Sequence, residues 1–164
     1  MARIAEGSVP HRLELAPARP EDLPAIRALL AEVGLPADDV GAAEQVFLVA
    51  SDGGGLAGCI GLEIHGESAL LRSFAVSPQR QGKGIGRALS QRAIAEARAR
   101  GVADLYLLTT TVEELASRAG FVRIDRAEVP EAVRASAQFR TLCSATAACM
   151  VLRQRRGQPG ASQA

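Results

Sequence analysis

The sequence has 164 residues, a formal net charge of +1 at pH 7, and 48% hydrophobic but only 3% aromatic residues. This length suits one domain that buries its own hydrophobic core. The near-neutral charge gives no general case for binding nucleic acid or an anionic membrane surface, and the scarcity of aromatic residues argues against base stacking on single strands. Residues 1–11 contain no apolar signal-peptide core, and no apolar run reaches transmembrane length, so we expect a cytoplasmic protein.

Elements in the first half of the chain follow from the spacing of apolar residues. Alternation predicts a short strand over Arg12–Ala16, and a one-sided apolar pattern predicts a helix over Pro20–Val33. Residues 34–43 contain glycine, proline and aspartate, which predict a loop. A meander of three antiparallel strands is then expected at Gln45–Ser51, Leu56–His65 and Ser68–Val76.

The second half continues with a helix from Gly84 to about residue 100, which carries apolar residues at four-residue spacing. A strand over Leu105–Thr109 completes a strand–helix–strand unit. A helix, a strand, a helix and a last strand are expected at Thr111–Ala119, Phe121–Ile124, Pro130–Leu142 and Ala147–Leu152. In the second of these helices, the residues expected to share a face are Ala132, Ala135, Phe139 and Leu142. We therefore predict one mixed α/β domain over residues 12–153, with a flexible N-terminus (1–11) and a disordered tail (154–164).

The segment Gln81–Gly86 reads Gln-Gly-Lys-Gly-Ile-Gly and lies between an apolar strand and a helix. The first N–H groups of a helix have no partner within it, and the helix dipole adds positive charge there, so this turn suits an anion such as a pyrophosphate. Lys83 and Arg87 can add charge beside it. A P-loop would need glycine in place of Ser77 and serine or threonine in place of Gly84. A dinucleotide-binding fingerprint would need glycine in place of Arg87, so the sequence fits neither of these phosphate-binding motifs.

The spacing Gln-x-x-Gly-x-Gly, directly after a strand that ends in Ala75-Val76, resembles the acetyl-CoA motif of the GNAT acetyltransferase superfamily. The resemblance extends to the element order and implies a GNAT fold, of the α/β (α+β) class, with a central mixed twisted sheet of about seven strands flanked by helices. It also implies acetyl-CoA as cosubstrate without a metal, and a small-molecule amine as partner; a homodimer stays open. The residues that the resemblance assigns to the coenzyme are Phe74, Ala75, Val76, Gln81, Gly82, Lys83, Gly84, Ile85, Gly86 and Arg87.

Shorter segments are similar to the arsenic-resistance N-acetyltransferase branch of that superfamily, notably those at 71–76, 105–111, 118–121 and 124–130. That branch includes enzymes that acetylate arsenic-containing amino acids, so the implied acceptor is a small acidic amino acid or an arsenic-containing analogue. The segment at 107–111 is also similar to acetyltransferases that make N-acetylglutamate, which is the alternative. A non-catalytic acetyl-CoA-binding protein stays open as well, because many GNAT enzymes have a tyrosine general acid where this chain has Ala116.

Acetyl transfer to an amine needs an unprotonated nucleophile, and a primary α-amine with a pKa of about 8 requires only a modest base. Glu63 and His65 lie two residues apart on a predicted strand and therefore share a face. Glu63 resembles the base position of many family members, so we expect direct transfer with Glu63 as general base. A structural ion pair is the alternative for this residue.

Arg72 lies within an apolar strand, where an unpaired cation would be costly. It either pairs with Glu63 or Glu67 across the hairpin or binds an anionic group of the substrate. The expected substrate-binding residues are Arg72, Ser73 and Arg134. The backbone N–H groups near Phe74–Val76 are expected to polarise the thioester carbonyl.

The cysteines, Cys59, Cys143 and Cys149, lack the spacing of metal ligands. We interpret them as free thiols and expect no metal site.

Overall fold

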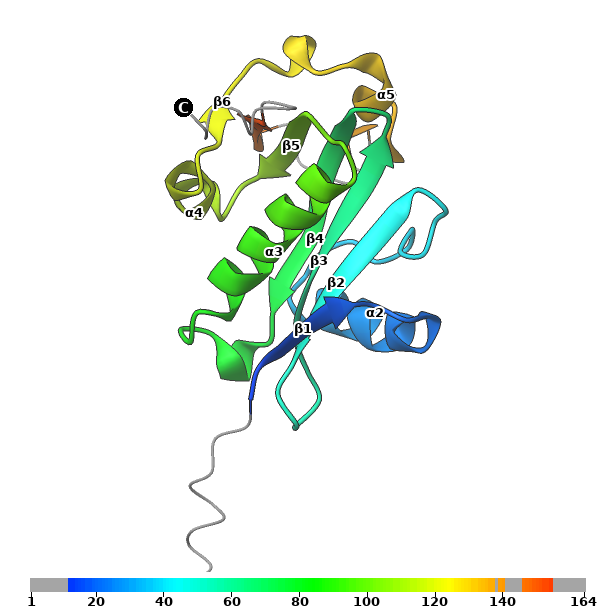
Figure 1. Cartoon of the computed structure of the whole chain (residues 1–164), viewed down its shortest axis with the longest axis vertical. Helices are drawn as coiled ribbons and strands as arrows, with labels where there is room; N and C mark the ends of the chain where they lie inside the picture. Colours follow the sequence, from blue (N-terminus) through cyan, green and yellow to red (C-terminus); the bar gives the residue numbers. More distant parts are fainter. Residues whose placement is uncertain (1–11, 138, 141–145, 155–164) are drawn as a thin grey trace, which may run out of the picture.

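The computed structural model describes residues 12–137, 139–140 and 146–154, and the strands among them form one seven-stranded sheet (Figure 1). The strand order across the sheet is β1-β2-β3-β4-β5-β7-β6. β4 and β5 pair in parallel and the other pairs are antiparallel, so the sheet is mixed, as predicted. The strands are β1 (Glu14–Pro17), β2 (Gln45–Ser51), β3 (Leu56–His65), β4 (Ser68–Val76), β5 (Asp104–Thr109), β6 (Val122–Arg123) and β7 (Ala148–Arg153).

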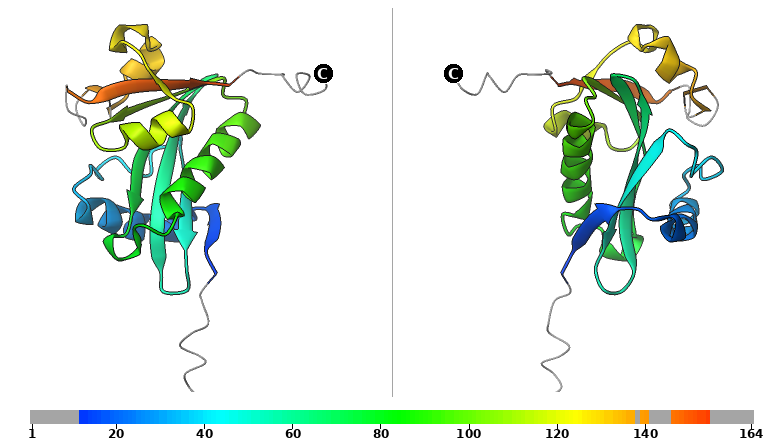
Figure 2. Two further views of the ribbon diagram at one scale, coloured as in Figure 1. Left: turned by 90° about the vertical axis from the view of Figure 1, so that its left-hand side faces the viewer. Right: turned by 45° about the vertical axis from the view of Figure 1, so that its right-hand side comes forward.

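Helices cover both faces of the sheet (Figure 2). α3 (Ile85–Ala99) and α4 (Glu113–Arg118) lie on one face, and α2 (Leu23–Glu32) and α5 (Glu131–Arg134) lie on the other. Three short 3-10 turns are also present: η1 (Pro20–Asp22), η2 (Pro78–Arg80) and η3 (Arg126–Glu128). No helix in the described part of the chain is long and apolar enough to cross a membrane. The sheet flanked by helices confirms the predicted fold class.

The longest helix, α3, packs on the sheet through a row of small and branched residues, as its spacing predicted. The buried members of this row are Ile85, Leu89, Ala93 and Ala97. They belong to one core cluster with Ile60 and Leu62 of β3. Burial of a side chain such as Leu89 contributes roughly 1.5–3 kcal/mol. The helix ends before Gly101, whose φ of 84° is the left-handed conformation that glycine adopts easily.

The helix predicted over Pro130–Leu142 is interrupted, and only part of its predicted face is packed. α5 ends at Arg134, residues 137 and 139–140 are helical again, and residues 138 and 141–142 lie outside the described part of the chain. Phe139 of the predicted face packs against the core cluster that contains Val133. The buried residue of α5 is Val133, whereas Ala132 and Ala135 are exposed. The larger valine side chain buries more apolar surface against the sheet than either alanine would, and this decides which side faces inward.

Two other predicted elements are shorter than expected. Residues 20–22 form a 3-10 turn before α2, because the Asp22 carboxylate accepts the Arg19 backbone N–H at 2.8 Å. The strand predicted over Phe121–Ile124 pairs only at Val122–Arg123, while the side chain of Phe121 is buried in the core.

Gln154, which we placed at the start of a disordered tail, belongs to the folded domain. The residue is only 7% exposed, and its backbone N–H donates to the Ala103 carbonyl at 2.6 Å. Its side-chain oxygen accepts from Arg98 Nε at 3.1 Å. A buried amide needs such partners, so the fold extends at least to this residue.

β4 parts from β5 about halfway along its length. The parallel pairs between them end at Leu71 and Leu107. At the same level the register between β3 and β4 shifts between Cys59 and Gly61, which marks a β-bulge. Ser73 in this bulge has a φ of 55°, a left-handed conformation that is uncommon outside glycine. Because a bulge bends and twists its strand, the second half of β4 diverges from β5.

Candidate active site

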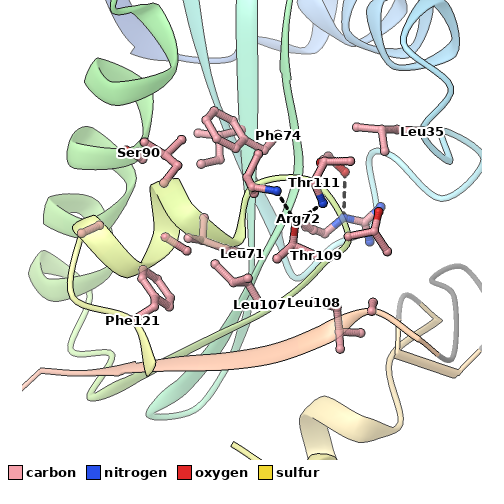
Figure 3. Close-up of a pocket in the computed structure, with 18 of the residues that line it drawn as sticks. Leu35, Leu71, Arg72, Phe74, Ser90, Leu107, Leu108, Thr109, Thr111 and Phe121 are labelled. Carbon is pink, nitrogen blue, oxygen red and sulfur yellow. Dashed lines mark hydrogen bonds between the residues drawn. The ribbon is translucent and has the colours of Figure 1, made fainter. Parts of the chain in front are cut away.

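A cavity of about 250 Å³ lies where β4 and β5 part (Figure 3). Residues 71–74 of β4 and residues 107–112 at the end of β5 line its centre. Ser90 and Phe121 lie on the α3–α4 side, and the loop Gly34–Pro36 lies on the α2 side. The cavity therefore passes between the two strands from one face of the sheet to the other.

The glycine-rich turn precedes α3, and its glycines are required for different reasons. Gly82 and Gly84 have φ values of 82° and 81°, and no atom lies within 4 Å of a Cβ built on either one. Gly86 is helical, but a Cβ there would lie 3.3 Å from Phe74 Cζ. The first two glycines therefore set the course of the turn, while the third permits close packing of α3 on β4.

The N-terminal end of α3 has the properties of an anion site. Gly84 is its N-cap, and the first intrahelical bond runs from the Ala88 N–H to the Gly84 carbonyl. The N–H groups of residues 85–87 therefore lie at the free end of a fifteen-residue helix. Lys83 and Arg87 are exposed beside this end, while Ile85 is buried in the core.

Two side chains brace this turn, and neither interaction was predicted. Arg80 makes a double contact with Asp52 of the β2–β3 hairpin, through Nε at 2.6 Å and Nη2 at 3.1 Å. Gln81 Nε2 donates to the Val76 carbonyl at 3.2 Å. The turn is thereby tied both to a distant hairpin and to the end of β4. The partners of Arg80 depend on the hairpin register, which sequence spacing does not reveal.

The predicted coenzyme residues of β4 point in different directions. Phe74 lines the cavity, whereas the side chain of Ala75 packs with the cluster under α2. The Ser77 N–H donates to the Ala57 carbonyl of β3 at 2.8 Å. Because backbone groups alternate along a strand, those of Val76 face away from β3 and toward the diverging side. The structure thus places backbone hydrogen-bonding groups, rather than polar side chains, along this edge.

Thr109 stabilises the turn at the end of β5, which lines the side of the cavity opposite β4. Its Oγ1 accepts the N–H groups of Thr111 at 3.0 Å and Val112 at 2.8 Å. Val112 is the N-cap residue of α4, so this hydroxyl fixes the turn that leads from β5 into the helix (Figure 3).

Arg72 is at the centre of a buried ion-pair cluster. Its side chain has no exposed surface, and Nη1 lies 2.6 Å from Asp39 Oδ2 and 3.1 Å from Glu63 Oε1. Nη2 contacts the second oxygen of Asp39 at 2.5 Å, and Nε donates to Ser73 Oγ at 3.1 Å. The Arg72 guanidinium lowers the pKa of Asp39, mainly through these hydrogen bonds. Pairing with Glu63 matches one predicted alternative, but Asp39 was missed because it lies 33 residues away on a loop.

Glu63 lies in this cluster and is not among the residues that line the cavity. One of its oxygens accepts from Arg72, and the other lies 3.0 Å from His65 Nε2. Both carboxylate oxygens are therefore engaged on the α2 face of the sheet.

The other predicted substrate residues are separated. Ser73 lines the cavity, but Arg134 is exposed on α5 and is not among the lining residues. Arg126 supports the wall instead: its Nη2 donates to the carbonyl of Ala147, a lining residue, at 2.9 Å. The Arg126 guanidinium also lies 5.8 Å from the centre of the Phe139 ring.

No tyrosine is available as a general acid in the cavity. Ala116 is buried and lines it, and the sequence has a single tyrosine, Tyr106. Tyr106 packs with Leu70 and Val133 on the α5 face, and burial raises its pKa. Protonation of a leaving group in this cavity must therefore use water or another group.

The described cysteines are buried and free. Burial raises the pKa of the Cys59 thiol to about 12, so it stays protonated and is a poor nucleophile. Cys143 lies outside the described residues. Within the described residues, no group of three or more His, Cys, Asp or Glu side chains could hold a metal ion.

Comparison with known proteins finds a similarity to one family of domains. Residues 43–123 match the family model described as "Acetyltransferase (GNAT) domain". A search of curated proteins finds no match.

Solved structures extend the match to most of the chain. N-acetylglutamate synthase from Neisseria gonorrhoeae, in complex with coenzyme A and L-arginine, is 27% identical with a TM-score of 0.71. That match covers 88% of this chain but only 34% of the synthase, so this chain spans about a third of that protein. Rv2747 from Mycobacterium tuberculosis, in complex with CoA and NLQ, is 26% identical with a TM-score of 0.74 and covers 87% of this chain and 99% of that one.

The ribosomal-protein-S18-alanine N-acetyltransferase from Escherichia coli is 21% identical, with a TM-score of 0.70, and covers 90% of this chain and 97% of that one, a likeness of fold. The family match extends from β2 to β6 and includes the glycine-rich turn and most residues that line the cavity, but not Gly34–Pro36 or Ala147. Residues 43–123 are therefore similar to a GNAT acetyltransferase domain, and the fold of the rest of the described chain agrees with this similarity.

Proposed function

We propose that this protein is an acetyl-CoA-dependent N-acetyltransferase whose acceptor is the amine of a small amino acid. The observation that carries the proposal is the cavity between β4 and β5, lined by Ser90 of α3, the helix whose N-terminal end follows the glycine-rich turn. Two similar structures contain CoA, and one of them is an N-acetylglutamate synthase.

In this proposal the pyrophosphate of acetyl-CoA lies against the N–H groups of residues 85–87, with Lys83 and Arg87 beside it. The pantetheine extends along the diverging edge of β4, which offers backbone groups as a neighbouring strand would. The thioester then reaches the bulge at Ser73. The acceptor enters from the α2 side, past the loop Gly34–Pro36.

The reaction is a direct transfer. The amine nitrogen forms a bond to the thioester carbon, and backbone N–H groups near Phe74–Val76 stabilise the developing oxyanion. The carbon–sulfur bond then breaks and CoA leaves with the electron pair. A thiol pKa of about 8.5 allows it to leave as a thiolate near neutral pH, which makes a tyrosine acid unnecessary.

The proton of the acceptor amine needs a base, and Glu63 remains our candidate. Its oxygens are engaged by Arg72 and His65, so Glu63 takes the proton through water rather than by direct contact. If Glu63 is only a member of the ion-pair cluster, water alone removes the proton.

The acceptor class follows from two similarities. The N-acetylglutamate synthase structure favours glutamate and related amino acids. The segments similar to the arsenic-resistance branch favour arsenic-containing amino-acid analogues as the second acceptor class. The exposed Arg134 supports neither class, because it is not among the residues lining the cavity.

Release of free thiol from acetyl-CoA tests this proposal. The purified protein is incubated with glutamate, other amino acids, arsenic-containing amino acids, polyamines and lysine, and the products are identified by mass spectrometry. N-acetylation of a small amino acid is the expected result. CoA binding without transfer to any amine would instead indicate a coenzyme-binding protein, and transfer only to polyamines or lysine would overturn the acceptor class.

A further inference from the structure

The loop between α2 and β2 forms the wall of the cavity on the side from which the proposed acceptor enters. Gly34, Leu35 and Pro36 line the cavity there, and Leu35 is 38% exposed (Figure 3). Val40, further along this loop, is buried against α2. The N–H groups of Gly34 and Leu35 donate to carbonyls of α2 at 3.1 and 2.8 Å, so α2 itself holds the first part of the wall. The position of Pro36, at the end of the wall, depends on what holds the segment between Pro36 and Val40.

Three side chains hold this segment. Arg27 Nη2 donates to the Val40 carbonyl at 2.9 Å, and Gln45 Nε2 donates to the Asp39 carbonyl at 3.0 Å. These two come from α2 and β2, the elements that flank the loop in sequence. The third is Arg72, which contacts both carboxylate oxygens of Asp39 and comes from β4, beside the bulge. Arg72 thus links the loop to the strand on which the thioester is proposed to react.

The same contacts limit what else Arg72 can bind. A guanidinium recognises a carboxylate best through two parallel N–H groups, and Asp39 occupies that arrangement. Glu63 accepts a further bond from Nη1, so one arginine already faces two carboxylates. An acidic acceptor would have to displace Asp39, which is held close by its own chain and therefore competes at a high effective concentration.

We propose that Arg72 is a positioning residue that acts through Asp39: it fixes the segment Pro36–Val40, and with it the end of the cavity wall at Pro36, and thereby sets which acceptor fits, rather than binding the acceptor itself. This inference rests on the proposed N-acetyltransferase function. Rigid placement of a wall matters because a displacement of about 1 Å at a reacting group can cost about a hundredfold in rate.

Asp39→Asn is the decisive variant, because asparagine keeps the shape but replaces one of the two acceptor oxygens with an NH₂ donor, so it cannot make the bidentate contact with a guanidinium. We expect the KM of the acceptor to rise about tenfold or more, while the KM of acetyl-CoA changes less than about twofold. Asp38→Asn is the matched control, since Asp38 is the neighbouring carboxylate in the loop but is exposed, and it should leave both constants unchanged. Arg72→Lys, which keeps the charge and is less disruptive than alanine at a buried site, should resemble Asp39→Asn, and the two changes combined should cost little more than either one.

If Arg72 instead bound the acceptor directly, the acceptor KM would change in the opposite direction in the Asp39 variant. Asp39→Asn would then free the guanidinium and lower the KM of an acidic acceptor, while Arg72→Lys would raise it. Either that result or an additive double variant would overturn the proposal.

Hydrogen exchange separates this inference from the proposed function. In the free protein, Asp39→Asn and Arg72→Lys should speed amide exchange in the peptide covering residues 34–42, and Asp38→Asn should not. This readout does not require turnover. Unchanged exchange in both variants would refute the positioning role even in an active enzyme. Absence of acetyl transfer in the wild type, with faster exchange in the variants, would refute the proposed function and leave Arg72 as a tether of the loop.

Discussion

Gly84 offers a quantitative test of the coenzyme turn. Its φ of 81° lies in the left-handed region, where an L-residue costs about 1–2 kcal/mol relative to glycine. No atom lies within 4 Å of an added Cβ, so Gly84→Ala introduces backbone strain without a steric clash. Any change in CoA affinity caused by Gly84→Ala can therefore be assigned to the backbone angle φ alone.

The strain should appear in coenzyme affinity. Gly84 is exposed, so in the free protein the turn can relax toward negative φ and rotate its N–H groups. Binding of the pyrophosphate must restore the original angle, and the restored strain weakens binding. At about 1.4 kcal/mol per factor of ten, a cost of 1–2 kcal/mol corresponds to roughly a 5–30-fold increase in the Kd of CoA.

Gly101→Ala is the matched control at the other end of α3. Gly101 has a φ of 84°, also with no atom within 4 Å of an added Cβ. Its N–H donates to the Arg98 carbonyl at 3.0 Å, which holds the angle in the folded protein. This variant should lower the Tm by about 2–4 °C per kcal/mol and leave CoA binding unchanged. Calorimetric titration with CoA and thermal unfolding measure the two effects, and unchanged CoA affinity in Gly84→Ala would refute our assignment of the turn.

Three further predictions concern the ionisable groups. Glu63→Gln should lower turnover at pH 7 by about 10²–10⁴-fold, with a loss that shrinks as pH approaches the amine pKa; a pH-independent loss would assign Glu63 to the ion-pair cluster alone. Because the pKa of Asp39 is lowered by Arg72, this carboxylate stabilises the fold above its ordinary pKa of about 3.9 and ceases to do so as pH falls through its lowered pKa. Denaturant unfolding of wild type and Asp39→Asn should therefore differ at pH 6 and converge in strong acid, and a constant difference would contradict the ion pair. Cys59, with its pKa raised to about 12, should resist iodoacetamide at pH 8 in the native protein and react after unfolding; rapid native labelling, seen by mass spectrometry, would disagree with its burial.

Features with short-range causes could be predicted from the sequence. The glycine spacing at Gln81–Gly86 and the four-residue repeat of α3 are local signals, and the structure confirms the strand–turn–helix order that they predict. The cost of burying an unpaired guanidinium also predicted that Arg72 needs an anionic partner. Glu63, on the neighbouring strand of the hairpin, was one of the predicted partners, and the structure shows this pair.

Features that depend on contacts between distant segments required the tertiary structure. Asp39 reaches Arg72 only because the loop after α2 folds back over the sheet, and Asp52 reaches Arg80 only through the hairpin register. The bulge at Ser73, which opens the cavity, arises from the pairing of β3 with β4, and the residue with positive φ is a serine, which sequence spacing does not single out. Sequence spacing reports the periodicity of each element, which backbone geometry sets locally. Packing between elements decides which residues share a buried site, because a buried charge without a partner costs desolvation free energy.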